Sequence, residues 1–302
     1  MNGISWNLDR REALGIVGES GCGKTVTALS ILRLVSDPPG RIVGGKILFE
    51  GNDLLKLSEN QMEELRGNRI SMIFQDPMNS LDPVFTIGNQ IAEVFQFHQG
   101  MSRRDALEQS IEMLKTVKIP SPEERVSEYP YQMSGGMQQR VMIAMALACR
   151  PQVLIADEPT TALDVTIQAQ ILDLMLKLKE ELDTAIILIT HDLGIIAEVA
   201  QRVIVMYAGE IVEEATVDEI FENPLHPYTR GLLQSMPHVD QRSKRLARLQ
   251  EIPGVVPGLN ELPQGCLFHP RCPQTMEICR EESPEWIQIS DRASVRCWRH
   301  SK

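Results

Sequence analysis

The sequence predicts an α/β fold in which helices cover both faces of a mostly parallel sheet. Two observations carry this prediction. Short apolar runs alternate with segments that are apolar at helical spacing, first in residues 13–33 and again in residues 153–206. Such alternation is typical of parallel strands joined by helical crossovers. Between these stretches, the pattern over residues 78–149 or so is helical, which indicates a helical block inserted into the α/β core.

The individual elements are expected from apolar periodicity and from the breakers that separate them. Strands are expected at Ala13–Val17, Lys46–Glu50, Arg69–Phe74, Val153–Ala156, Ala185–Ile189 and Arg202–Met206. Helices are expected at Val26–Arg33, Gln90–Phe97, Arg104–Val117, Gly136–Cys149, Ile167–Leu182, Leu193–Ala200, Val217–Phe221 and Tyr228–Met236. The chain then becomes rich in proline and glycine, which indicates a small C-terminal extension.

The composition is that of an ordinary globular protein, with 302 residues of which 43% are hydrophobic and 24% charged. No apolar run approaches the ~20 residues of a membrane-spanning helix. Residues 1–6 lack the charged-then-apolar order of a signal peptide, so we expect a cytosolic chain. The net charge of −11 argues against a nucleic-acid partner. A basic run at Arg242, Lys244, Arg245 and Arg248 is interpreted as a solvated linker.

A glycine-rich segment between the first strand and the first helix predicts a triphosphate-binding loop. It consists of Gly18, Glu19, Ser20, Gly21, Cys22, Gly23, Lys24 and Thr25. Its glycines allow backbone N–H groups and the helix N-terminus to face an anion. Lys24 is expected to reach the β- and γ-phosphates of ATP, and the Thr25 hydroxyl to bind Mg²⁺. The alternative is a glycine-rich turn that carries Lys and Thr by chance.

Two carboxylates follow the apolar run Val153–Ala156. Asp157 is expected to hold Mg²⁺, directly or through water. Glu158 is expected to act as the general base that polarises the attacking water. The alternative is an acidic turn after a strand, and the phosphate loop upstream favours the catalytic interpretation.

Two further segments are less specific when each is taken alone. Ser134, Gly135 and Gly136 stand at the start of a helix, where they form either an anion-binding N-terminus or a plain N-cap. His191 follows a strand, a position at which a lone histidine is more often structural.

Four of the six cysteines crowd the C-terminal end of the chain. They are Cys266, Cys272, Cys279 and Cys297, separated by five, six and seventeen residues. In a reducing cytosol, such a cluster favours a metal or cluster site over disulfides. The spacing lacks the closely spaced pair of cysteines that is usual for structural zinc. This favours an iron–sulfur cluster, with Zn²⁺ and buried free thiols as alternatives.

In their order along the chain, these motifs resemble those of the ATP-binding subunit of an ABC transporter, over essentially all of residues 1–215. The resemblance implies a RecA-like P-loop ATPase core with an inserted helical subdomain at about 78–149. It also implies that the Ser134 motif contacts ATP held by the phosphate loop of a second ABC ATPase subunit. Met133 and Met137 depart from the usual Leu and Gln of that motif.

The same resemblance implies roles for three single residues. Gln75 matches the glutamine that senses Mg²⁺ and water near the membrane-subunit interface. Asp164 resembles the D-loop aspartate, and His191 resembles the switch histidine that contacts the γ-phosphate. In the implied mechanism, ATP joins two subunits and its hydrolysis releases them, so that the work is done on a separate membrane protein.

The C-terminal part resembles one branch of that family. Asn223–Leu233, Phe74–Pro83 and Gly265–Pro273 are similar to segments of importers of oligopeptides, dipeptides and nickel. The resemblance implies that residues 216–302 form an importer-type extension in which Cys266, Cys272, Cys279 and Cys297 bind a [4Fe–4S] cluster. It implies a heterodimer beneath two membrane permeases, served by an extracytoplasmic peptide-binding protein. The chain would then lie peripherally on the cytoplasmic face of the membrane.

Peptide import is therefore the expected function, with nickel as an alternative cargo. A soluble ABC-type ATPase acting on DNA or ribosomes is a second hypothesis, against which the single cassette and the charge of −11 argue. A cassette that assembles without turnover is a third.

One segment departs from the family pattern. The phosphate loop begins after only seventeen residues, and no aromatic residue matches the one that stacks on adenine. Residues 1–6 are expected to align with a strand in which Trp6 faces the sheet. We therefore expect either weak binding of adenine or a truncated N-terminus.

Overall fold

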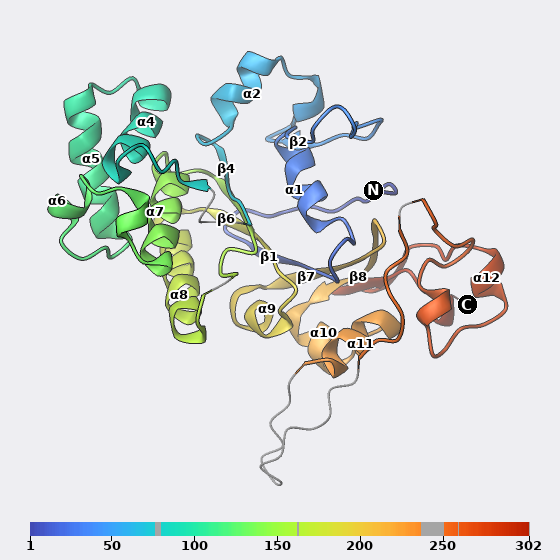
Figure 1. Cartoon of the computed structure of the whole chain (residues 1–302). Helices are drawn as coiled ribbons and strands as arrows, with labels where there is room; N and C mark the ends of the chain where they lie inside the picture. Colours follow the sequence, from blue (N-terminus) through green and yellow to red (C-terminus); the bar gives the residue numbers. More distant parts are fainter. Residues whose placement is uncertain (76–79, 162, 237–250, 259, 302) are drawn as a thin grey trace, which may run out of the picture. The chain divides into compact units, whose positions relative to one another are not determined.

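The computed structural model of the chain (Figure 1) describes residues 1–75, 80–161, 163–236, 251–258 and 260–301. These residues form two compact units. Unit 1 consists of Met1–Asn7, Ala13–Thr27 and Ile189–Lys302, and unit 2 of Leu8–Glu12 and Ala28–Leu188. Residues 76–79 of the importer-like segment Phe74–Pro83, and the basic run from Arg242 to Arg248, lie outside the described residues.

Unit 2 contains three adjacent strands in the order β4, β5, β6. They span Ile70–Ile73, Val153–Asp157 and Ala185–Ile189, the last residue of β6 belonging to unit 1. β4 and β5 run parallel, with Ile73 opposite Ala156 at their carboxyl ends. β6 is buried along its whole length. Burial on both faces explains why these strands read as continuous apolar runs.

The inserted block of unit 2 is helical, as predicted. Its helices are α4 (Ile87–Gln99), α5 (Arg103–Thr116), α6 (Pro122–Arg125) and α7 (Gly135–Leu147), and α8 (Val165–Leu182) follows β5. α4, α5 and α7 lie side by side in Figure 1, where they are green. Thr86, Ser102 and Ser134 cap these three helices, because each side-chain oxygen accepts a backbone N–H bond from the first turn.

Unit 2 also contains small elements that the sequence pattern did not predict in full. The expected strand at Lys46–Glu50 is shorter, with β2 (Leu48–Phe49) paired to β3 (Asn52–Asp53) in a two-residue ladder. α2 (Glu59–Leu65) begins at a capping box formed by Ser58 and Gln61. The capping box was visible in the sequence, but this helix is too short for a clear apolar period.

Unit 1 is built on strands in the order β1, β7, β8, β10, β9. They span Ala13–Val17, Arg202–Tyr207, Glu210–Thr216, Ala293–Val295 and Ile287–Ser290. β1 and β7 are parallel, whereas β7–β8, β8–β10 and β10–β9 are antiparallel. The helices of this unit are α9 (Leu193–Val199), α10 (Val217–Glu222), α11 (Pro227–Gln234) and α12 (Ile278–Glu281). α1 (Lys24–Ile31) begins in unit 1 and ends in unit 2. Short 3-10 turns occur in each unit: at Leu54–Lys56 and Pro130–Gln132 in unit 2, and at His269–Arg271 and Trp298–His300 in unit 1.

The strand expected at residues 1–6 is not formed. Asn2 donates its N–H to the carbonyl of Gly209, but most of these residues are exposed and none of them is in a strand. Trp6 is half-buried. Alternation in a short segment predicts a strand only where a partner strand provides the ladder.

Among the helices that the structure describes, none has both the length and the apolar character that crossing a bilayer requires.

Candidate nucleotide-binding site

The predicted phosphate loop connects β1 to α1 in unit 1. Its glycines adopt positive φ angles of 152° at Gly18, 82° at Gly21 and 106° at Gly23. A Cβ atom on Gly18 would lie 2.3 Å from the carbonyl oxygen of Met206 at the end of β7. Position 18 therefore requires glycine, because the backbones of the loop and the strand touch there.

The lysine of the loop is folded over the loop itself. Lys24 is only 7% exposed. Its ammonium donates to the carbonyls of Gly18 (2.7 Å) and Glu19 (3.2 Å). Thr25 is half-buried in the first turn of α1. The N-terminus of α1 and the Lys24 charge thus lie at the same loop, an arrangement that favours binding of a polyphosphate.

The structure directs Glu19 and Cys22 away from solvent and into the surrounding unit. Cys22 is fully buried, and burial raises the pKa of its thiol. The Cys22 carbonyl accepts the N–H of Gly209 (2.9 Å). The N–H of Glu19 donates to the Tyr228 hydroxyl (2.8 Å). Ser20 and Gly21 are exposed between these anchors.

His191 lies two residues after the end of β6, directly after Thr190. The N–H of Thr190 donates to the carbonyl of Ile16 (3.2 Å), two residues before the loop. His191 is exposed there. Asp192 then caps α9, accepting the N–H of Gly194 at 2.7 Å. Within unit 1, the histidine and the phosphate loop therefore both leave the strands at the edge where ligands of α/β sheets bind.

In unit 2, the parallel ladder of β4 and β5 brings three predicted residues to one edge. The Gln75 amide, two residues after β4, donates to Glu158 Oε2 (3.1 Å). Thr161 donates its hydroxyl to the same oxygen (3.0 Å). Asp157, the last residue of β5, is 1% exposed. Glu158 has a left-handed backbone conformation with φ of 47°. In residues other than glycine this conformation costs conformational energy, and it recurs at functional sites.

This edge has the chemistry expected of an ATP-hydrolysing site. A carboxylate such as Asp157 is a ligand that Mg²⁺ prefers. The Glu158 carboxylate accepts hydrogen bonds from two donors, Gln75 and Thr161, which fix its orientation at this edge.

A second pair of predicted residues caps two helices in unit 2. Ser134 accepts the N–H of Met137 (3.4 Å) at the start of α7. Asp164 accepts two N–H bonds at the start of α8. A Cβ atom on Gly135 would lie 3.7 Å from the Leu163 side chain, so the two helix starts are neighbours. Ser134, Gly135 and Asp164 are all exposed.

The first departure from the family motif has a simple physical reason. Met133 is 7% exposed and packs as an apolar residue before α7. Methionine and leucine have similar volumes, so a buried position accepts either.

A sequence model of the ABC transporter family matches residues 1–161, more than half of the 302 residues. The chain belongs to the ABC transporter family. A second model, described as the oligopeptide/dipeptide transporter C-terminal region, matches residues 212–279.

Relatives of this ABC protein match nearly all of its length. It is 58% identical to a probable peptide ABC transporter ATP-binding protein of Sinorhizobium fredii over 302 residues, covering 100% of this chain and 90% of the relative. It is 53% identical to the oligopeptide transport ATP-binding protein OppD of Bacillus subtilis, covering 99% of this chain and 83% of OppD. A solved dimeric ATP-binding cassette, MJ0796 in a post-hydrolysis state bound to ADP and Pi, matches with a TM-score of 0.62 and 28% identity. That match covers 70% of this chain and 88% of the cassette, and it agrees with the predicted RecA-like α/β core.

The four C-terminal cysteines of this ABC protein are free thiols. The pKa of the Cys266 thiol is raised to about 11, mainly by burial and to a lesser extent by the thiols of Cys279, Cys297 and Cys272. The N–H of Cys266 donates to the carbonyl of Cys279 (2.8 Å). Within the described parts of the chain, however, no group of three or more His, Cys, Asp or Glu side chains is arranged to hold a metal ion.

Thr161, Tyr228 and Arg271 of this ABC protein contact predicted site residues, and the sequence motifs did not predict these contacts. Thr161 holds Glu158, Tyr228 holds the Glu19 N–H, and Arg271 pairs with the Glu19 carboxylate. Thr161 lies only three residues after Glu158, so its proximity could have been inferred. Tyr228 and Arg271 are more than 200 residues from the loop, and only the folded chain brings them there.

Proposed function

We propose that this chain is the ATP-hydrolysing subunit of a membrane ABC importer for dipeptides or oligopeptides. The observation that carries the proposal is the bond from Gln75 to Glu158 at the carboxyl edge of β4 and β5. The names of the relatives from S. fredii and B. subtilis support a peptide cargo. Among the described residues, no contact favours nickel, the alternative cargo.

In the proposed reaction, Lys24 and the N-terminus of α1 would neutralise charge on the phosphates, and Thr25 and Asp157 would be the residues that hold Mg²⁺. Glu158 accepts a proton from the attacking water, and His191 stabilises the γ-phosphate. Phosphoryl transfer requires positioning and charge neutralisation more than covalent chemistry, which is what these groups supply.

A second ATPase subunit is part of the proposal, most simply a similar chain in a heterodimer. The exposed residues Ser134, Gly135 and Asp164 would complete the partner's nucleotide site. Val165 beside them is 83% exposed and Tyr131 is 71% exposed, and such apolar side chains suit a surface that a partner covers. Two permeases, an extracytoplasmic binding protein and a position on the cytoplasmic face of the membrane complete the assembly.

We also assign residues 1–215 as the nucleotide-binding domain, with the helical subdomain at about 78–149, and 216–302 as the extension. The family match at residues 212–279 supports this division. Limited proteolysis of the chain with MgATP should protect the first segment more than the second.

The function is tested on the assembled transporter in lipid vesicles with its binding protein. Peptide is expected to stimulate ATP hydrolysis and to accumulate in the vesicle lumen. Glu158→Gln should lower the hydrolysis rate by at least about 10²-fold, because it removes the general base, and should leave MgATP binding intact. Hydrolysis that nickel stimulates and peptides do not would reassign the cargo, and an unaffected rate in Glu158→Gln would remove the proposed base.

For the extension, we propose that Cys266, Cys272, Cys279 and Cys297 bind a [4Fe–4S] cluster. A single zinc ion needs its sulfur ligands about 2.3 Å from one point. An iron–sulfur cluster is held by four Cys thiolates, and the support for the proposal is this donor set: four cysteines of the extension that are all free thiols. When bound, the cluster would cross-link the proline-rich segment. Anaerobic purification followed by absorbance spectra and by iron, sulfide and zinc analysis tests this, and one zinc per chain would overturn it.

A further inference from the structure

The second residue of the phosphate loop is held by an ion pair from the far end of the chain. Arg271 Nη1 lies 2.7 Å from Glu19 Oε2, and Arg271 Nη2 lies 2.9 Å from Glu19 Oε1. This two-pronged geometry is the strong form of an arginine–carboxylate pair. The Arg271 side chain is 5% exposed and the Glu19 side chain 31% exposed. The pair is therefore largely shielded from solvent.

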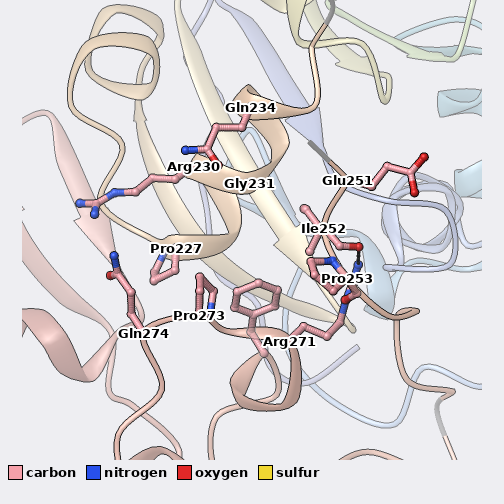
Figure 2. Close-up of a pocket in the computed structure, with 11 residues that line it drawn as sticks. Pro227, Arg230, Gly231, Gln234, Glu251, Ile252, Pro253, Arg271, Pro273 and Gln274 are labelled. Carbon is pink, nitrogen blue, oxygen red and sulfur yellow. Dashed lines mark hydrogen bonds between the residues drawn. The ribbon is translucent and has the colours of Figure 1, made fainter. Parts of the chain in front are cut away.

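The guanidinium is fixed by further partners on the extension and on β7. Arg271 Nε donates to the carbonyl of Pro253 (2.8 Å), and Nη2 also donates to that of Ile252 (3.3 Å), as Figure 2 shows. The guanidinium also lies over the Tyr207 ring, 5.8 Å from its centroid. Because these partners lie in two segments of unit 1 other than the phosphate loop, the position of Arg271 does not depend on Glu19 alone.

Tyr228 holds the same loop residue from a second side. Its hydroxyl accepts the Glu19 N–H at 2.8 Å. The ring is fully buried and packs edge-on against Tyr207, with centroids 4.8 Å apart, and against Phe268 at 5.3 Å. An aromatic cluster thus joins β7, α11 and the extension behind the phosphate loop.

The Glu19 carboxylate presents an electrostatic problem that Arg271 solves. A loop that receives ATP must accept a polyanion, and a carboxylate within it would repel the phosphates. At a separation of about 8 Å and an effective dielectric constant of about 20, the repulsion between two unit negative charges weakens the binding of the charged ligand by at least about tenfold. Arg271 neutralises that charge where the loop begins.

We propose that Arg271, assisted by Tyr228, is a positioning residue through which the C-terminal extension sets the affinity of the phosphate loop for ATP. Arg271 masks the Glu19 charge and fixes the Glu19 side chain away from the phosphates, while Tyr228 fixes its backbone. The proposal rests on the proposed function, since it concerns how the loop receives MgATP.

The test measures the dissociation constant of MgATP for the full chain by calorimetry, with thermal unfolding as a check of folding. Arg271→Met keeps the apolar stem and exposes the Glu19 charge, so the dissociation constant should rise about tenfold. Adding Glu19→Gln to Arg271→Met should bring the dissociation constant back to within about threefold of that of the unaltered chain, because residue 19 then carries no charge that needs masking. A purely structural role predicts no such rescue. Tyr228→Phe should raise the constant by a smaller factor, about fivefold.

Arg296→Met is the matched control. Arg296 also directly precedes a cysteine, donates to the backbone carbonyls of Ile211 and Pro284, and lies over an aromatic ring. It touches no residue of the phosphate loop in these contacts, so its loss should leave MgATP affinity unchanged. If Arg271→Met fails to fold, Arg271→Lys replaces it. That variant keeps the charge and should hold the dissociation constant within about threefold, whereas a tenfold rise would overturn the charge-masking role.

The outcomes separate the two proposals. Failure of the unaltered chain to bind MgATP would sink the proposed function itself. Normal binding by the unaltered chain together with an unchanged constant in folded Arg271→Met, or a rise that Glu19→Gln does not reverse, would overturn the inference alone. Raised salt provides a further readout, because the difference between Arg271→Met and the unaltered chain should shrink if it arises from charge.

Discussion

At the scale of single residues, two titratable side chains are buried together in unit 1. Glu213, on β8, is 1% exposed and accepts the N–H groups of Leu225 (2.7 Å) and His226 (2.8 Å) as well as the Thr229 hydroxyl. Burial raises the pKa of Glu213. Burial also lowers the pKa of His226 from 6.5 to about 3, and the nearby charges of His300 and Arg230 act in the same direction. The histidine is therefore neutral in the folded chain near neutral pH.

The histidine should make folding stability depend on pH. Between pH 6.5 and about 3, the unfolded chain binds a proton at His226 that the folded chain does not, so stability falls as pH falls through this window. From pH 8 to pH 5.5 this loss should reach about 1–2 kcal/mol. Glu213 has the opposite sign, since its raised pKa lets the folded chain hold a proton more readily as pH falls.

The contribution of His226 to the pH dependence of stability is isolated by denaturant unfolding of the unaltered chain and of His226→Asn at pH 8 and pH 5.5. In the unaltered chain, His226 Nδ1 accepts the Tyr228 N–H at 3.0 Å and so caps α11. The asparagine side chain also offers an acceptor for this N–H, so the cap is preserved. The variant should lose less stability on acidification than the unaltered chain. Equal losses would show that His226 is accessible to protons in the folded state.

At the scale of elements, the start of α8 combines a structural role with a proposed role in nucleotide binding. Asp164 accepts the N–H groups of Thr166 (3.1 Å) and Ile167 (3.0 Å), and so caps α8. The same carboxylate is proposed to act at the nucleotide site of the dimer. Since asparagine caps as well as aspartate does, substitution can separate the two roles.

Asp164→Ala should lower the free energy of unfolding by about 1 kcal/mol, because the N–H groups of the first turn of α8 lose their acceptor. Asp164→Asn should keep stability within about 0.5 kcal/mol. Chemical denaturation of both variants measures this, and ATPase assays of the assembled transporter run alongside. Full activity in Asp164→Asn would limit the residue to capping, whereas lost activity at unchanged stability would support its role at the nucleotide site.

β8 shows why an element can escape prediction. Its sequence, from Glu210 to Thr216, carries glutamates at positions that the pleat turns inward as well as outward. Glu213 faces inward because three donors from the segment after α10 satisfy its carboxylate. A strand pattern read from hydropathy treats that residue as solvent-facing and so breaks the run.

At the scale of the chain, the C-terminal segment completes the sheet of unit 1. β10 pairs antiparallel with β8, placing Val295 opposite Glu213 and Ala293 opposite Ala215. Val295 is fully buried, while Ile289 on the neighbouring β9 is 44% exposed. The extension thus covers an edge of β8 that would otherwise present unpaired backbone groups.

Val295→Asp should therefore destabilise unit 1 by more than about 3 kcal/mol, because it buries a carboxylate that lacks a compensating charge. Ile289→Asp is the matched control on the exposed strand and should cost about 0.5 kcal/mol or less. Thermal unfolding of the two variants distinguishes them. Similar, small losses in both would mean that β10 is not a structural part of the sheet.

Much of the α/β core was predictable from local patterns. β1 and β6 have the predicted limits, and α1, α4, α5, α7, α8 and α9 differ from the expected helices by a few residues at their ends. The places of the proposed site residues in the fold were predictable because each lies within two residues of a strand end or begins a helix, so that local patterns locate it. The importance of Gly18 was predictable for the same reason, although its contact with the Met206 carbonyl was not.

The sequence by itself determined the local chemistry of this protein: a glycine-rich loop after a buried strand, two carboxylates after another, and polar caps at helix starts. The tertiary structure alone decided which distant groups act on them. Arg271 and Tyr228 reach Glu19, and β10 reaches β8, across separations of about 80 to 250 residues. Apolar periodicity reports only which face of an element is buried. The partner of that face depends on how the elements pack, and in this chain the packing places the extension behind the phosphate loop.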